Sequence, residues 1–405
     1  MQLGWIDFSK TERNKILSVL DLLQERGTLD ELGIAPVRDG FANLFFPGTS
    51  TIQTRAKYFL IVPYALKTLE RSGDTNPGSV LRTLEGIERS CGEIFLNQNR
   101  SENGIIGKQS LLNGRWVQRN PSDIYWSGLK QYGIFVGGNF SLTEYVRTFC
   151  ALKTDKGTLK NLGNSNDNDD KTDYDDKDAG DLFSMQFWNI PTYRLNWMDS
   201  LSMTLTSDEA KFLKKKIVDS QKSSMLAHIL QNNMTEVLDC ETFDDLESII
   251  HKFPDMMQQD FYMALDFSRF LYIIRVMYNI MVSDGKNEEA NVQYSRLYPH
   301  FGVLADIDLD RIFDRLGIFT NTIMVSFLNQ AKEHILGGDM DSLRKCIRDR
   351  EVFLKGTSRS KTAHPGEFDP TAWFCGGMLD YRFTNAKAII RDIFEGEVSE
   401  DAKPE

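Results

Sequence analysis

Apolar residues recur along most of this chain at the spacing of α-helices. Residues 9–27 show the pattern clearly, because Ser9 and Glu12 have the spacing of a capping box and Gly27 is a typical residue at a helix end. Apolar side chains repeat between them at Ile16, Leu17, Leu20 and Leu23. This stretch is therefore expected to form an amphipathic helix.

Comparable patterns predict a mainly α fold with at most a few short strands. Further helices are expected at residues 78–97, 121–133, 141–152, 207–232, 242–252, 255–284, 307–337, 339–354 and 383–394. The segment 255–284 is apolar nearly all round, which is typical of a buried central helix. It contains Arg275 and its most apolar part is too short to span a bilayer. The best strand signals are the short segments 114–119 and 132–137.

A strongly acidic stretch divides the sequence. Residues 161–182 contain eight aspartates and almost no apolar side chains, so burial cannot offset the entropy of ordering them. The sequence therefore predicts an N-terminal helical domain at 1–152, a disordered linker at 153–182 and a C-terminal helical domain at 183–405.

Composition and charge limit the function. The net charge of −11 is distributed as +2 over residues 1–152, −4 over 153–182 and −9 over the remainder, so any nucleic-acid contact is expected in the N-terminal part. The five cysteines are far apart and include no metal-binding pair, which favours reduced thiols. No signal peptide or membrane span is apparent, so the expected location is the cytoplasm.

The segment 46–64, FPGTSTIQTRAKYFLIVPY, supports two interpretations. Ser50 and Gln53 have the spacing of a capping box, which would start a helix at this point and explain the hydroxyl residues without a ligand. Cations are disfavoured in the first turns of a helix. Arg55 and Lys57, together with Thr49, could therefore form a site for an anion such as a nucleic-acid phosphate.

A second dense segment, residues 107–133, interleaves cations with aromatic residues. Arg115, Arg119 and Trp126 are its candidate nucleic-acid contacts, since phosphate pairing and base stacking need these residue types. The alternative is that Ser122 caps a helix after Pro121, that the aromatic residues pack in the core and that the cations remain solvated.

Familiar catalytic patterns are missing from the sequence, and no cofactor or metal is expected. One alternative remains in the loop-like segment 356–383, where Arg359 and His364 have an R-x4-H spacing. A similar Arg/His pair on a helix carries RNA cleavage in ribonucleases of the HEPN type, with histidine as the acid-base group. Pro365 and the loop-like composition argue against a helix here.

Four motifs resemble an uncharacterised bacterial family of unknown function. They are GWIDFS at 4–9, LFFPGTSTIQTRAKYFL at 44–60, NPSDIYWSGL at 120–129 and GGMLDYRF at 376–383. The resemblance implies a link to antiviral defence loci that also encode helicases, and it supplies no catalytic residues.

The expected function is therefore that of a non-enzymatic adaptor or recognition subunit in a DNA-directed defence system. Its N-terminal domain would contact DNA, RNA or a helicase partner, and its C-terminal domain would bind protein. An RNase using Arg359 and His364 and a purely structural scaffold are the alternatives.

Overall fold

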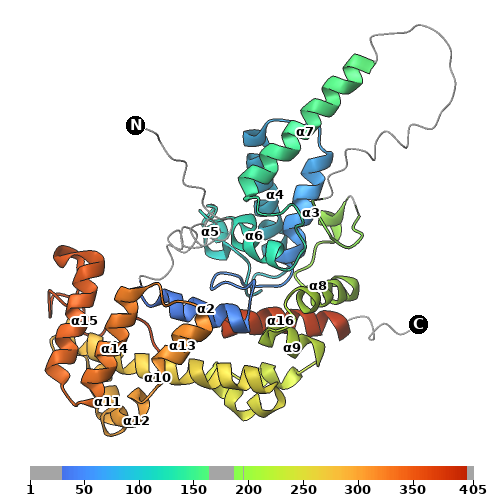
Figure 1. Cartoon of the computed structure of the whole chain (residues 1–405). Helices are drawn as coiled ribbons and strands as arrows, with labels where there is room; N and C mark the ends of the chain where they lie inside the picture. Colours follow the sequence, from blue (N-terminus) through green and yellow to red (C-terminus); the bar gives the residue numbers. More distant parts are fainter. Residues whose placement is uncertain (1–29, 164–186, 195, 399–405) are drawn as a thin grey trace, which may run out of the picture. The chain divides into compact units, whose positions relative to one another are not determined.

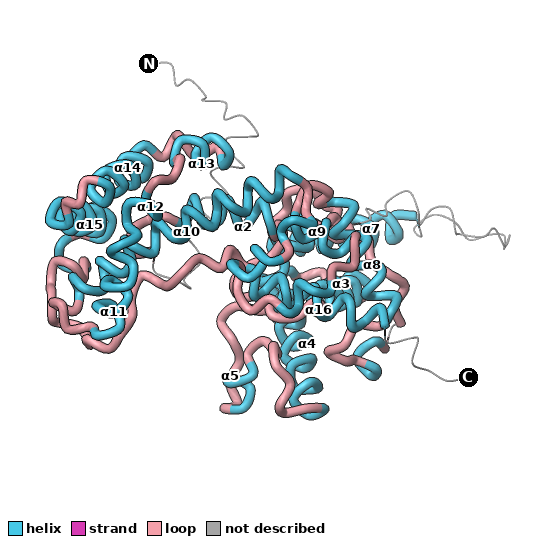
Figure 2. Tube along the Cα trace, turned by 90° about the horizontal axis from the view of Figure 1, so that it is seen from below, coloured by secondary structure: helices cyan, strands magenta, loops and turns pink. Residues whose placement is uncertain are grey.

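The protein is mainly α-helical. The computed structural model describes residues 30–163, 187–194 and 196–398 (Figure 1). Within these ranges the only β-type pairing is an isolated bridge between Phe135 and Trp188, and Figure 2 shows helices joined by loops. The mainly α prediction is confirmed, whereas the strands expected at 114–119 and 132–137 are not formed. The helix expected at 9–27 lies outside the described residues.

The chain divides into two compact units. The smaller unit consists of the chain up to Gly40, described from Asp30 onward, together with Tyr262–Leu379. The larger unit consists of Phe41–Phe261 and Asp380–Glu405. The domain boundary predicted at 153–182 remains a prediction, because most of that segment lies outside the described residues.

The larger unit contains most of the helices. They are α3 (Tyr58–Arg71), α4 (Pro77–Gln98), α5 (Lys108–Leu112), α6 (Pro121–Gln131), α7 (Leu142–Gly163), α8 (Ser207–Ser220), α9 (Met225–Gln231) and α16 (Phe383–Val398). In this unit, α3 packs against α4 and α6, and α16 packs against α8. Short 3-10 turns complete it at Trp197–Ser200, Thr235–Asp239, Asp244–Ser248 and Ile250–Lys252. The helix predicted at 242–252 is replaced by the last two of these turns.

Helix α7 continues into the segment predicted as a linker. Lys153 is part of its body, and the Lys153 Nζ donates hydrogen bonds to the carbonyl oxygens of Leu69 (2.8 Å), Ser72 (2.9 Å) and Asp74 (3.2 Å). These contacts bring a cation to the C-terminal end of α3, where it satisfies carbonyl groups that lack helical partners. The first residues of the predicted linker are thus helical.

The smaller unit is built from α11 (Glu288–Leu297), α12 (Phe301–Ala305), α13 (Leu309–Leu316), α14 (Thr322–Leu336) and α15 (Met340–Lys355), with 3-10 turns at Tyr298–His300 and Thr357–Arg359. Helices α14 and α15 lie side by side in it (Figures 1 and 2). The division between the units falls inside α2 (Ala35–Phe45) and inside α10 (Asp255–Val282). As the apolar pattern predicted, α10 is one long helix with many fully buried apolar side chains.

Candidate nucleic-acid interface

The helix that follows the FPGTS segment starts later than predicted. Helix α3 begins at Tyr58, so Ser50 does not cap it and Arg55 and Lys57 precede it. The Gln53 side chain is buried and donates instead to the carbonyl oxygens of Gly48 (3.2 Å) and Ile124 (3.4 Å). The capping-box prediction at 50–53 is therefore wrong, because the glutamine is used for a contact to a distant segment rather than to its own turn.

Segments 46–57 and 120–132 are held together through two tyrosines of the second segment. The Tyr125 hydroxyl accepts hydrogen bonds from the backbone N–H groups of Thr54 (2.9 Å) and Arg55 (3.1 Å), and the Tyr132 hydroxyl donates to Pro47 O (3.0 Å). The contact is so close that a Cβ added at Gly128 would lie 2.5 Å from the carbonyl oxygen at residue 48. Tight backbone approach thus explains the glycine in the NPSDIYWSGL motif.

Residues of the GGMLDYRF motif also contact segment 46–57. Arg382 donates from Nη1 to the Thr49 carbonyl oxygen (2.9 Å), and the ring of Phe383 packs on Phe46. Thr49 itself is buried, and its Oγ1 donates to Phe46 O (2.6 Å). Segments that are far apart in the sequence therefore meet in the larger unit, and the predicted anion-site residue Thr49 stabilises a turn there.

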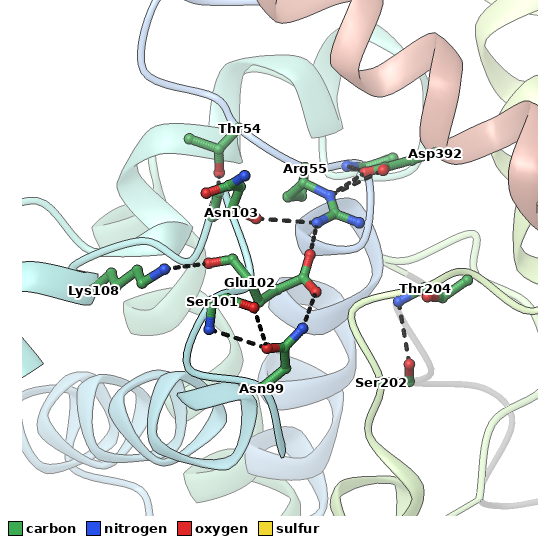
Figure 3. A network of polar contacts seen from close by, with 12 residues as sticks. Thr54, Arg55, Asn99, Ser101, Glu102, Asn103, Lys108, Ser202, Thr204 and Asp392 are labelled. Carbon is green, nitrogen blue, oxygen red and sulfur yellow. Dashed lines mark hydrogen bonds and ion pairs between the residues drawn. The ribbon is translucent and has the colours of Figure 1, made fainter. Parts of the chain in front are cut away.

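Arg55 is occupied by two carboxylates (Figure 3). Its Nε lies 2.9 Å and 3.0 Å from the two Asp392 carboxylate oxygens, and its Nη1 contacts Glu102 and donates to the carbonyl oxygen of Asn103 at 3.1 Å. The Asp392 Oδ2 also accepts from Ala56 N at 2.7 Å. Arg55 thereby links α16 to the loop after α4, a contact between residues separated by more than 300 positions that no local sequence pattern indicates.

Lys57 and Trp126 also make internal contacts. The Lys57 Nζ lies 2.6 Å from the Glu209 carboxylate, and the two side chains are only 6% and 11% exposed. Trp126 is buried, donates from Nε1 to the carbonyl oxygen of Phe140 (2.9 Å) and packs against Trp188. A phosphate or a base would have to displace these partners before it could reach either residue.

Arg115 and Arg119, in contrast, have exposed side chains. Both lie in the loop between α5 and α6 and are exposed, and neither has an ion-pair or side-chain hydrogen-bond partner within the described ranges. Arg100, in the loop that follows α4, is likewise exposed and unpaired there. These guanidinium groups can accept a phosphate without losing an internal contact.

The loop that carries Arg115 and Arg119 is held by its own hydrogen bonds. The backbone N–H of Arg115 donates to Ser110 O at 2.8 Å, and Trp116 Nε1 donates to the Asn120 side-chain oxygen at 2.7 Å. Asn120 stands at the start of α6, where its N–H donates to the Asp123 carboxylate at 3.3 Å. The two arginines therefore project from a structured loop.

Helix α6 does not begin with Ser122 as its cap, as the sequence predicted. Ser122 lies inside the helix, and its N–H and hydroxyl donate to the Glu88 carboxylate at 2.6 Å and 3.3 Å. Asn120 precedes the helix instead. The sequence indicated the helix correctly, but not that a buried acid from α4 would meet its first turn.

Comparison with known proteins gives one match. A family model described as a family of unknown function (DUF6361) matches residues 1–295. The chain belongs to this family. No curated protein and no solved structure matches it. The resemblance to a family of unknown function is thereby confirmed, and the description of DUF6361 names no activity.

The DUF6361 match includes the loop with Arg115, Trp116 and Arg119, and it ends before Arg359 and His364. Arg359 lies in a 3-10 turn, where its Nε donates to Lys355 O (2.9 Å). His364 lies in a loop; its Nε2 is 3.1 Å from Thr357 O, and its Nδ1 is 3.6 Å from the Glu367 carboxylate. The two residues thus share a loop region rather than a helix.

Other chemistry has little support in the described residues. They contain no group of three or more His, Cys, Asp or Glu side chains placed to hold a metal ion. Burial raises the pKa of the Cys91 thiol to about 12 and that of the Cys375 thiol to about 11, so neither is activated as a nucleophile. In the same part of the chain, no helix has both the length and the apolar content needed to cross a bilayer.

Proposed function

We propose that this protein is a non-enzymatic adaptor or recognition subunit of a bacterial antiviral, DNA-directed defence system. It contacts nucleic acid, or a helicase partner loaded on nucleic acid, through the loop that carries Arg115 and Arg119. The observation that supports this proposal is that both guanidinium groups are exposed and have no acidic partner among the described residues, in a protein whose net charge is −11.

The electrostatic argument depends on which cations are available. Arg55 and Lys57 neutralise buried acids of their own unit, so they add little to the outward field. Unpaired arginines can replace counterions along a phosphate backbone, and this exchange makes affinity fall as salt rises. Recognition by a small number of such contacts suits an adaptor, whose binding is strengthened when its partner is present.

The proposal predicts that Arg115→Ala with Arg119→Ala weakens binding to labelled DNA and RNA and flattens its salt dependence. Loss of two phosphate contacts should reduce the magnitude of the negative slope of log K against log salt by roughly 1.4 for single strands and roughly 1.8 for duplex DNA. The measurement is fluorescence anisotropy across a salt series. The matched control is Arg82→Ala with Arg147→Ala, which removes the same charge from exposed positions on α4 and α7 of the same unit. Equal binding by both double variants would contradict the proposal.

The alternative function as an RNase using Arg359 and His364 has its own test. It predicts cleavage of labelled RNA by the purified protein and loss of this cleavage in His364→Ala. The half-buried imidazole and its proximity to the Glu367 carboxylate provide a group suited to proton transfer. RNA that stays intact with the wild-type protein would exclude this alternative and leave the adaptor or a purely structural scaffold.

A further inference from the structure

The tryptophan between the two exposed arginines is held by contacts at two places on its ring system. Trp116 is partly exposed, and its indole N–H is fixed by the hydrogen bond to Asn120. The six-membered ring of the indole lies close to two glycines: a Cβ added at Gly92 would be 3.5 Å from its Cζ3 atom, and one added at Gly107 would be 3.4 Å from the same atom.

A side chain at either glycine would collide with a neighbouring residue. Gly92 lies in the middle of α4, where glycine costs up to about 1 kcal/mol relative to alanine. A Cβ at Gly92 would also approach Leu111 Cδ1 to 2.7 Å, and one at Gly107 would approach Val117 Cγ1 to 2.6 Å. Gly107 in addition has a φ of +73°. The backbone thus makes room for the segment that brings the indole onto α4.

The indole N–H and the Cζ3 region of the ring thus contact the protein, and the part of the indole that stays exposed is the part that can meet a ligand. We propose that Trp116 is a stacking platform for a base of single-stranded nucleic acid, with Arg115 and Arg119 binding the phosphates on either side. This proposal rests on the proposed function and assigns it a substrate class. An unpaired base offers an aromatic face that stacks on tryptophan regardless of sequence, whereas the bases of a duplex are already stacked.

The neighbouring charges fit this assignment. The acid in the adjacent loop, Glu102, is occupied by Arg55, and Asp123 is bonded to the backbone of Asn120. Arg100, which follows α4 in the same unit, is a third exposed arginine with no side-chain partner in the part of the chain that the structure describes. In the sequence the aromatic group therefore stands between two exposed arginines, while the acids near it in the sequence are already engaged.

The test compares Trp116→Leu and Trp116→Phe with the wild-type protein. Leucine occupies space beside the two glycines but cannot stack, and phenylalanine retains an aromatic face. Anisotropy is measured with a 20-nucleotide single strand, as DNA and as RNA, and with the corresponding duplex. We expect Trp116→Leu to lose roughly tenfold or more in single-strand affinity and to leave duplex affinity unchanged, with Trp116→Phe in between. Thermal unfolding of each variant serves as the check on folding.

A second measurement follows Trp116 in the wild-type protein, without a substitution in the protein that binds the ligand. The indole N–H signal of Trp116, assigned by its absence in Trp116→Leu, should shift when an oligothymidine is added to the wild-type protein. A parallel loss of single-strand and duplex affinity in Trp116→Leu, or an indole signal that does not move, would overturn the stacking assignment. The proposed function would survive either result if the Arg115/Arg119 double variant still lost affinity, and it would fail only if that variant bound normally.

Discussion

At the scale of the residue, Glu88 is the clearest case of a group whose chemistry is changed by its position. It is 1% exposed, and its carboxyl group accepts hydrogen bonds from the N–H and hydroxyl of Ser122. Burial raises its pKa from 4.5 to about 8, against the opposing effect of the Ser122 hydrogen bonds and with a smaller contribution from the charges of Asp123 and Glu85. The folded protein therefore holds a proton on Glu88 at a pH where the unfolded chain releases it.

This proton makes stability depend on pH. Between about pH 4.5 and 8 the folded state binds more protons at Glu88 than the unfolded state, so the free energy of unfolding should fall as the pH rises, by up to about 1.4 kcal/mol per pH unit. Glu88→Gln removes the titration, and we expect its stability to decline less over this window. Urea unfolding of both proteins at pH 5, 6, 7 and 8 measures the difference. Parallel curves would show that Glu88 does not titrate in this range.

Glu88 also shows why this detail could not be predicted from the sequence. Its spacing from Leu84 and Cys91 puts it on the apolar stripe of the helix, unlike Glu85, but no residue nearby in the sequence indicates which group would pair with it. Its burial depends on the start of α6, 34 positions later. The same limit applies to Lys57, which was a candidate anion-site residue in the sequence and is paired with Glu209 in the structure.

At the scale of the element, Asp392 anchors α16 to the segment before α3. Its carboxylate is 5% exposed in the side chain and accepts from Arg55 Nε and from Ala56 N. We expect Asp392→Asn to lower the free energy of unfolding by about 3 kcal/mol, because an arginine would be left with one buried partner fewer. Glu395→Gln, at an exposed position of the same helix, is the control. Urea unfolding compares the two, and equal stability would mean that the Arg55–Asp392 pair contributes nothing.

Helices with a strong apolar period were predicted well from the sequence. The breaks that divide one predicted helix into two were not. The helix expected at 307–337 is divided into α13 and α14 by Gly317, which has a φ of +66°, and by Asn321, whose side chain accepts from Met324 N at 3.3 Å. Glycine as a helix stop and asparagine as a helix start were visible in the sequence. The apolar residues on both sides kept the helical spacing and concealed the break.

Only part of the exposure pattern of the candidate interface residues could be predicted from the sequence. Arg115 and Arg119 could be named from the sequence, since exposure of charged side chains is the usual expectation. The choice of Trp126 as the stacking residue was not supported by the geometry, because it packs in the core. The choice between Trp116 and Trp126 depends on how α4 and α6 pack, and the sequence pattern alone does not contain that information.

At the scale of the whole molecule, the polar centre of the smaller unit is Glu351 on α15. Its carboxylate is fully buried and accepts from the hydroxyls of Tyr278 (2.7 Å), Ser360 (2.9 Å) and Thr362 (2.7 Å). Burial acts to raise its pKa, but the hydrogen bonds from the Thr362 backbone and from the hydroxyls of Tyr278 and Thr362 outweigh it, so the pKa is lowered. The carboxylate thus ties α10, α15 and the following loop together in its charged form.

Because the described chain forms two compact units, damage at Glu351 should remain within the unit that contains it. We expect Glu351→Gln to lose about 3 kcal/mol or more of local stability, since its amide group would face N–H and hydroxyl donors that need an acceptor. Hydrogen exchange should then speed up in α14 and α15 but remain unchanged in α8, with Glu289→Gln on the exposed face of α11 as the control. Faster exchange in both units to the same extent would show instead that they unfold as one cooperative body. In the expected case, binding by Arg115 and Arg119 should survive Glu351→Gln, because those residues belong to the other unit.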